Sequence, residues 1–144
     1  MRNAYRWLTS VLFVAVVVQV GLAGYGAFNA IHKAENASVS KKTIEDGFGA
    51  HAAAGSLIVL VMLVLLIVAL AGRLGPTAVK WAGGLLGLGI LQTVLGVVST
   101  SVPALGFLHT VNALAIYAAA ALLAHRTWTQ HRTSGDEMEI APSV

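Results

Sequence analysis

The chain has 144 residues, of which 57% are hydrophobic and only 10% are charged, and its mean hydropathy is +0.79. About a quarter of the residues in a soluble domain are charged, so this composition excludes an ordinary soluble protein and indicates a membrane protein. The net charge of +3 does not indicate nucleic-acid binding, because the basic residues flank the apolar segments. The absence of cysteine excludes disulfides, thiolate metal sites and covalent haem attachment through a Cys-x-x-Cys-His motif.

Four apolar segments without acidic or basic side chains each approach or exceed the roughly 20 residues that cross a bilayer. They are residues 8–31, 48–72, 81–100 and 104–124. We expect four transmembrane helices joined by short connections, in a single domain over residues 1–126. The polar remainder, residues 127–144, is predicted to be a disordered cytoplasmic tail. The expected fold class is all-α, an integral membrane four-helix bundle embedded in the lipid bilayer.

Basic residues favour one side of this predicted bundle. Six of them fall on the side of the two termini: Arg2, Arg6, Arg73, Lys80, Arg126 and Arg132. The opposite side carries three lysines, whose charge is offset by carboxylates such as Glu45 and Asp46. Positively charged loops stay in the cytoplasm. The sequence therefore predicts a multi-pass protein of the cell membrane with both termini cytoplasmic.

Two short stretches read like copies of each other, Gly47-Phe48-Gly49-Ala50-His51 and Gly106-Phe107-Leu108-His109. Each places a histidine near the start of an apolar segment. A small residue follows each histidine four positions on, Gly55 or Ala113, and so lies on the same helix face. The two halves of the chain thus resemble two helical hairpins that repeat in parallel, with a two-fold axis along the membrane normal.

A glutamine lies near the middle of the first helix in each predicted hairpin, at Gln19 and Gln92. A midplane glutamine most often hydrogen-bonds a neighbouring helix. Two-fold packing of the hairpins would bring His51 and His109 to facing positions at one depth, nearer the outer face.

A histidine inside a membrane span is a functional-site hypothesis by default, and two in matching frames favour a shared ligand. Imidazole nitrogen is a common axial ligand of haem iron, and four-helix bundles build cofactor sites from facing helices. We therefore predict one haem b near the outer face, with His51 and His109 binding its metal. The rest of the predicted site consists of small residues beside the ligands, aromatic covers and polar groups: Gly24, Gly55, Gly96, Ala113, Phe48, Phe107, Tyr25 and Asn112.

Other functions remain open at this point. The histidines could bridge helices by hydrogen bonds alone, in a cofactor-free accessory or small-molecule-binding protein. With His32 they could form a three-histidine site for zinc or copper. A quinone could occupy the same cleft or act as the redox partner.

Parts of the chain resemble the haem A synthase family. Leu91-Gln92-Thr93-Val94-Leu95-Gly96 and Leu108-His109-Thr110-Val111-Asn112-Ala113 are similar to the third and fourth helices of one half of those enzymes. Thr43-Ile44-Glu45 followed by His51-Ala52-Ala53-Ala54-Gly55 resembles the second helix less closely. The synthases are eight-helix proteins made of two similar halves, each with a histidine pair near the outer side. By position, the resemblance implies that His51 and His109 are the axial ligands.

The chain departs from that family in three respects. It corresponds to one half, it lacks the outer-loop cysteine pair of many members, and Glu45 is not at the spacing of the family's glutamate. Local electron transfer or haem handling is therefore the expected role, and enzymatic activity stays open. A homodimer, formed through small-residue helix faces, could rebuild the eight-helix arrangement and act as a membrane oxidase. The chain also resembles small four-helix bacterial membrane proteins.

Overall fold

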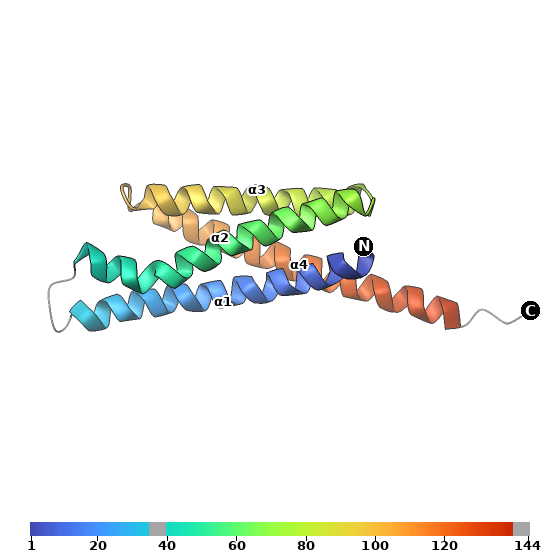
Figure 1. The fold of residues 1–144 in the computed structure, drawn as a ribbon, viewed down its shortest axis with the longest axis horizontal. Helices are drawn as coiled ribbons and strands as arrows, with labels where there is room; N and C mark the ends of the chain where they lie inside the picture. The colour runs from blue at the N-terminus through green and yellow to red at the C-terminus, as the bar shows by residue number, and fades with distance from the viewer. Residues whose placement is uncertain (35–39, 140–144) are drawn as a thin grey trace, which may run out of the picture.

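The protein consists of four long helices in a computed structural model that describes the backbone of residues 1–34 and 40–139 and the side chains as far as residue 129. The helices are α1 (Arg2–Ala34), α2 (Lys41–Ala71), α3 (Pro76–Ser99) and α4 (Leu105–Glu139) (Figure 1). Each contains a stretch long and apolar enough to cross a membrane. This confirms the prediction of an all-α chain with four membrane-length helices.

Each helix packs against two others. The contacting pairs are α1 with α2, α2 with α3, α3 with α4, and α4 with α1. It follows that α1 lies diagonally opposite α3 and that α2 lies diagonally opposite α4. Consecutive helices run in opposite directions (Figure 1). We call the end where α1 joins α2 and α3 joins α4 the loop end, and the end with the N-terminus and the α2–α3 turn the terminal end.

Three helices begin earlier than their apolar segments, at Arg2, Lys41 and Pro76. At the start of α2, the backbone N–H of Thr43 donates to the side-chain oxygen of Ser40 at 3.2 Å, so Ser40 caps the helix. Ion pairs one turn apart follow, with Lys41 3.5 Å from Glu45 and Lys42 3.5 Å from Asp46. A cap and such pairs stabilise polar helical turns outside an apolar span. Hydropathy alone does not detect them.

The structure continues helix α4 into the segment that the sequence assigned to the tail. Helix α4 continues to Glu139, whereas residues 140–144 lie outside the described residues. The helix extends because its first predicted tail residues pack on α1. The hydroxyl oxygens of Thr127 and Thr9 lie 3.1 Å apart, and the indole N–H of Trp128 donates to Ser10 at 2.8 Å. The guanidinium of Arg6 stacks over the Trp128 ring at 4.3 Å.

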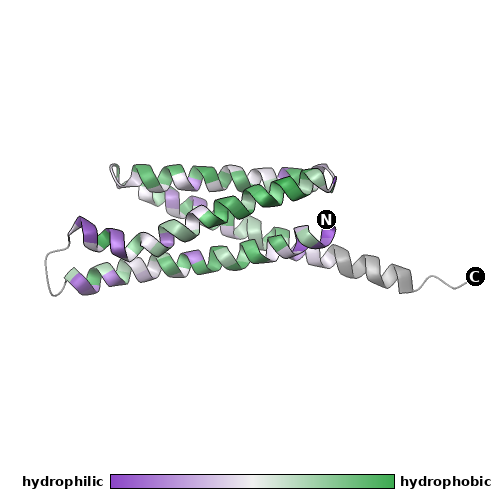
Figure 2. Cartoon of the chain, viewed as in Figure 1, coloured by the Kyte–Doolittle hydropathy of each residue, from purple (hydrophilic) through white to green (hydrophobic). Residues whose placement is uncertain are grey.

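The hydrophobic core fills the part of the bundle nearer the terminal end. The largest fully buried apolar side chains are Leu12, Met62, Leu65 and Leu85, contributed by three helices. The outer surface is also apolar, since side chains such as Leu57 and Leu114 are exposed. Figure 2 shows hydrophobic residues along the middle of the helices and hydrophilic residues on the first turns of α2. An apolar outer band between polar ends suits a lipid environment.

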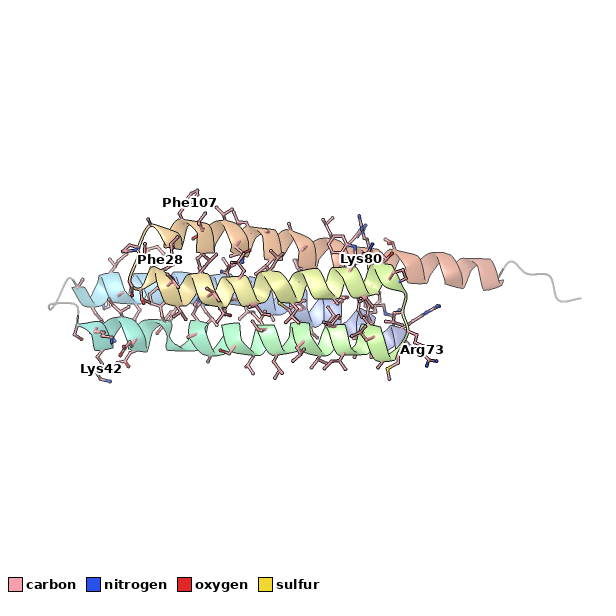
Figure 3. The ribbon with its side chains drawn as sticks, turned by 90° about the horizontal axis from the view of Figure 1, so that it is seen from above. Phe28, Lys42, Arg73, Lys80 and Phe107 are labelled. Atoms are coloured by element: carbon pink, nitrogen blue, oxygen red, sulfur yellow. The ribbon has the colours of Figure 1, made fainter. Side chains whose placement is uncertain are left out.

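The α2–α3 turn brings positive charge to the terminal end. Its backbone reverses over four residues and places Gly75 at a φ of 96°, a conformation that glycine adopts without strain. Arg73 and Lys80 flank this turn, and Lys42 lies at the opposite end of the bundle (Figure 3).

Candidate functional site

The rings of His51 and His109 face each other across the bundle. His51 lies on α2 and His109 on the diagonally opposite α4, yet their ring centroids are 6.4 Å apart, with an angle of 61° between the ring planes. Both residues are half-buried. The two repeated hairpins therefore each contribute one imidazole to the same small volume.

The backbone of the neighbouring helix orients each ring. The Nδ1 atom of His51 lies 3.2 Å from the carbonyl oxygen of Gln19, and the Nδ1 atom of His109 lies 3.1 Å from that of Gln92. A carbonyl oxygen only accepts, so each Nδ1 carries the hydrogen. In the neutral rings, Nε2 is then the atom with the free electron pair. Both histidines thus have Nε2 as their electron-pair donor.

The glutamine side chains contact these Nε2 atoms. The side-chain nitrogen of Gln92 lies 3.0 Å from Nε2 of His109, and that of Gln19 lies 3.4 Å from Nε2 of His51. Glutamine and histidine are 32 residues apart in the first hairpin and 17 in the second, yet the glutamine contacts both ring nitrogens of the histidine in each. The shared pattern shows that the repeat extends from the sequence to the hydrogen bonds.

Sequence reasoning missed this pairing, because it placed the glutamines at the midplane and the histidines nearer the outer face. The polar start of α2 explains the difference for the first hairpin. Helix α2 begins at Lys41, so His51 lies almost three turns inside it, beside the middle of α1. The signal that could have revealed the pairing was the order of glutamine and histidine in both hairpins.

The two hairpins differ at one position. Asn112, three residues after His109, is only 8% exposed. Its side-chain nitrogen donates to the side-chain oxygen of Gln92 at 2.7 Å and to the carbonyl oxygen of Leu88 at 3.0 Å. Three residues after His51 the chain has Ala54. Accordingly, the side-chain oxygen of Gln19 is buried and has no hydrogen-bond partner among the described residues.

Two of the four predicted small residues lie directly against the site. A Cβ atom added at Gly55 would lie 3.0 Å from the side-chain nitrogen of Gln19, and one added at Gly96 would lie 3.1 Å from Cε1 of His109. Ala113 is half-buried, one turn after His109. A Cβ atom added at Gly24 would have no neighbour within 4 Å among the described residues.

The structure brings only one of the predicted aromatic residues to the histidines. The ring of Phe48 packs edge-on against that of His51, with centroids 6.1 Å apart. Phe107 is 72% exposed and points away from the bundle (Figure 3), and Tyr25 is 64% exposed. The spacing explains the first difference. Phe48 precedes His51 by three positions and shares its helix face, whereas Phe107 precedes His109 by two and lies on the other side of α4.

The site marks the boundary of the packed core. Every buried apolar side chain among the described residues lies on the terminal-end side of the layer formed by Gln19, His51, Gln92 and His109. The imidazoles therefore lie at the loop-end limit of the buried apolar core.

Among the described residues, no group of three histidine, cysteine, aspartate or glutamate side chains is positioned to hold a metal ion. His32 lies near the end of α1 and is exposed. The structure therefore does not form the alternative three-histidine site.

Comparisons with protein-family models, with curated proteins and with solved structures gave no match. The resemblance to one half of haem A synthase stays a prediction from the sequence.

Proposed function

We propose that this chain is a membrane haem-binding protein that holds one haem b between His51 and His109, in the service of local electron transfer or haem handling. The observation that carries the proposal is the approach of the two imidazoles across the bundle, with ring centroids 6.4 Å apart. Two imidazoles bound to one metal ion from opposite sides, each by a bond of about 2.1 Å, have ring centroids about 6 to 7 Å apart.

The hydrogen bonds of the rings also suit metal ligation. Histidines that bind metals usually donate their other ring N–H to a carboxylate, a water or a backbone carbonyl, which fixes the tautomer and the ring orientation. Both His51 and His109 have this arrangement, with the Gln19 and Gln92 carbonyls as acceptors. Because Nδ1 is engaged in this way, Nε2 is the atom of each ring that can bind iron.

The surroundings of the rings fit a flat cofactor. Gly55 and Gly96 keep the walls beside the site thin. Phe48 supplies an apolar contact next to His51. The haem, when bound, would supply a one-electron couple. His51 and His109 would hold it and set its potential, and the apolar core would exclude water from its inner side.

The orientation that we propose in the cell membrane has the terminal end in the cytoplasm. The terminal end carries Arg73 and Lys80, and the loop end carries Lys41 and Lys42, whose charges are offset by carboxylates within 3.5 Å. Stacking of Arg6 on Trp128 adds the arginine and tryptophan pairing that is typical of a membrane interface. The haem would then lie toward the outer side, where it would exchange electrons with a quinone or another redox partner.

The test is the absorption spectrum of protein purified from haem-replete cells in mild detergent. We expect a Soret band and a reduced-minus-oxidised difference spectrum of a b-type haem. The variants His51→Ala and His109→Ala should each alter this spectrum. The matched control is His125→Ala, which removes an exposed histidine more than four turns after His109 on α4 and should leave the spectrum unchanged.

Two outcomes would count against the proposal. Purified protein without a Soret band would indicate that the histidines only join helices through their glutamine hydrogen bonds. A haem spectrum that persists unchanged in the double variant of His51 and His109 would show that the iron binds elsewhere.

A further inference from the structure

The two imidazoles are not equivalent, although the hairpins that carry them repeat. The electron pair on Nε2 of His109 accepts a hydrogen bond of 3.0 Å from Gln92, whereas the corresponding distance between Gln19 and His51 is 3.4 Å. Hydrogen bonds of N–H donors in proteins usually span about 2.7–3.2 Å, so the contact at His51 is the weaker of the two. His51 therefore has the more available electron pair.

Asn112 reinforces this difference by locking the Gln92 amide. It donates one amide hydrogen to the side-chain oxygen of Gln92 and the other to the carbonyl oxygen of Leu88. With its oxygen held by Asn112, Gln92 must point its NH₂ group at His109. The network is only slightly exposed at Asn112, so water cannot easily replace its bonds.

The Gln19 amide has no such lock. Its nitrogen makes its shorter hydrogen bond, 2.8 Å, to the backbone carbonyl of His51 rather than to the ring. Its oxygen is buried without a partner among the described residues. The His51 ring can therefore turn its Nε2 to a metal and leave the best hydrogen bond of Gln19 intact.

We propose that, in the haem site proposed above, His51 is the permanent ligand of the iron and His109 the exchangeable one. Asn112 is the positioning residue, because it holds the Gln92 amide that competes with the iron for Nε2 of His109. A small uncharged ligand such as a diatomic gas would compete with His109 for the iron, one iron–nitrogen bond being exchanged for one iron–ligand bond without transfer of electrons or protons. The Nε2 atom of His109 would then again accept the hydrogen bond that the locked Gln92 amide offers. This inference rests on the proposed function and adds to it that the haem would bind a small external ligand in place of His109.

Carbon monoxide is the probe for the exchange, added to the reduced, haem-loaded protein. We expect the wild type to bind it, with His109→Ala keeping its haem and binding carbon monoxide more tightly. His51→Ala should lose most of its haem during purification. Asn112→Ala frees Gln92 to turn away, so His109 should hold the iron more firmly and carbon monoxide affinity should fall by about fivefold, the equivalent of one hydrogen bond.

Thr110→Val is the matched control for Asn112→Ala. Thr110 is also on α4, and its hydroxyl also donates to a backbone carbonyl, that of Gly106 at 3.0 Å, but it is exposed. Its removal should change carbon monoxide affinity by less than about twofold, since it shares no partner with the network. Equal haem retention in His51→Ala and His109→Ala, or equal effects of the Asn112 and Thr110 variants, would overturn the inference.

Nitrogen-15 NMR of the haem-free wild type tests the lock without the cofactor. A hydrogen bond to an unprotonated imidazole nitrogen moves its resonance upfield, so Nε2 of His109 should resonate upfield of Nε2 of His51. Asn112→Ala should remove the difference. Identical resonances in the wild type would overturn the inference. A protein that shows the difference but takes up no haem would instead overturn the proposed function and, with it, the assignment of ligand roles.

Discussion

Gly96 and His109 are in van der Waals contact across the α3–α4 interface, because a Cβ atom on Gly96 would lie 3.1 Å from Cε1 and 3.3 Å from Nδ1 of the ring. The helix backbone of α3 thus bounds one side of the space that the His109 ring occupies. The same ring atom, Nδ1, is the one that contacts the Gln92 carbonyl. Space at Gly96 and orientation of His109 are therefore coupled.

Gly96→Ala is expected to push the His109 ring away from α3 and to lengthen its hydrogen bond to Gln92. Overpacking of this kind destabilises a folded protein by about 1–3 kcal/mol. Chemical unfolding of the purified protein in detergent measures the change. Gly21→Ala is the control, since a Cβ atom there has no neighbour within 4 Å among the described residues. If both variants unfold alike, the contact with His109 does not limit the space at Gly96.

Gly89 and Met62 make a second close contact, in the core. A Cβ atom on Gly89 would lie 2.6 Å from the sulfur of Met62, a side chain that is fully buried. Gly89→Ala should therefore destabilise the bundle by about 1–3 kcal/mol. The loss should shrink in a Met62→Ala background, with a coupling energy of about 0.5–3 kcal/mol in a double-mutant cycle. Additive effects would contradict the contact.

Much of the fold follows from hydropathy and from the repeat. Apolar segments of sufficient length predict four membrane-length helices, and the matching frames of His51 and His109 predict that their rings meet. What hydropathy does not report is where a helix continues into water. Polar caps and contacts between α1 and α4, such as that between Ser10 and Trp128, extend the helices at both ends of the bundle.

The composition of the site was harder to predict, because it depends on single positions within a turn. A difference of one residue in spacing sends Phe107 outward while Phe48 stays beside its histidine. The hydrogen-bond partners of the histidines lie on the preceding helix of each hairpin. Predicting them therefore requires knowing how far the two helices of a hairpin are shifted along each other. That shift depends on where α2 begins, at Lys41.

The proposed orientation predicts the accessibility of single cysteines, which the cysteine-free chain makes simple to test. Ser101→Cys lies in the α3–α4 turn at the loop end, and Thr77→Cys lies at the start of α3 at the terminal end; both positions are exposed. In intact cells, a maleimide that cannot cross the membrane should label the first and not the second. Both should react once the membrane is permeabilised. The reverse pattern in intact cells would contradict cytoplasmic termini.

Asn112→Ala should destabilise the bundle as well as alter the site. It removes two hydrogen bonds, to Gln92 and to Leu88, and takes away the donor to the side-chain oxygen of Gln92. An orphaned polar group of this kind costs about 1–3 kcal/mol. Chemical unfolding of the haem-free protein measures the loss. Thr110→Val serves again as the control and should change the free energy of unfolding by less than about 0.5 kcal/mol.

The repeat also predicts a stabilising substitution. Ala54 occupies in the first hairpin the position that Asn112 occupies in the second, three residues after the histidine, and it is half-buried. Ala54→Asn would place an amide donor beside the unpartnered oxygen of Gln19. By the same geometry, its second amide hydrogen would face the carbonyl of Ala15, four residues before Gln19.

A satisfied hydrogen bond should raise the free energy of unfolding by about 1 kcal/mol. Ala53→Asn, one position earlier and exposed, is the matched control and should give no gain. If Ala54→Asn destabilises the bundle as much as Asn112→Ala does, the two hairpins are not interchangeable at this position, and the oxygen of Gln19 is not a vacant acceptor.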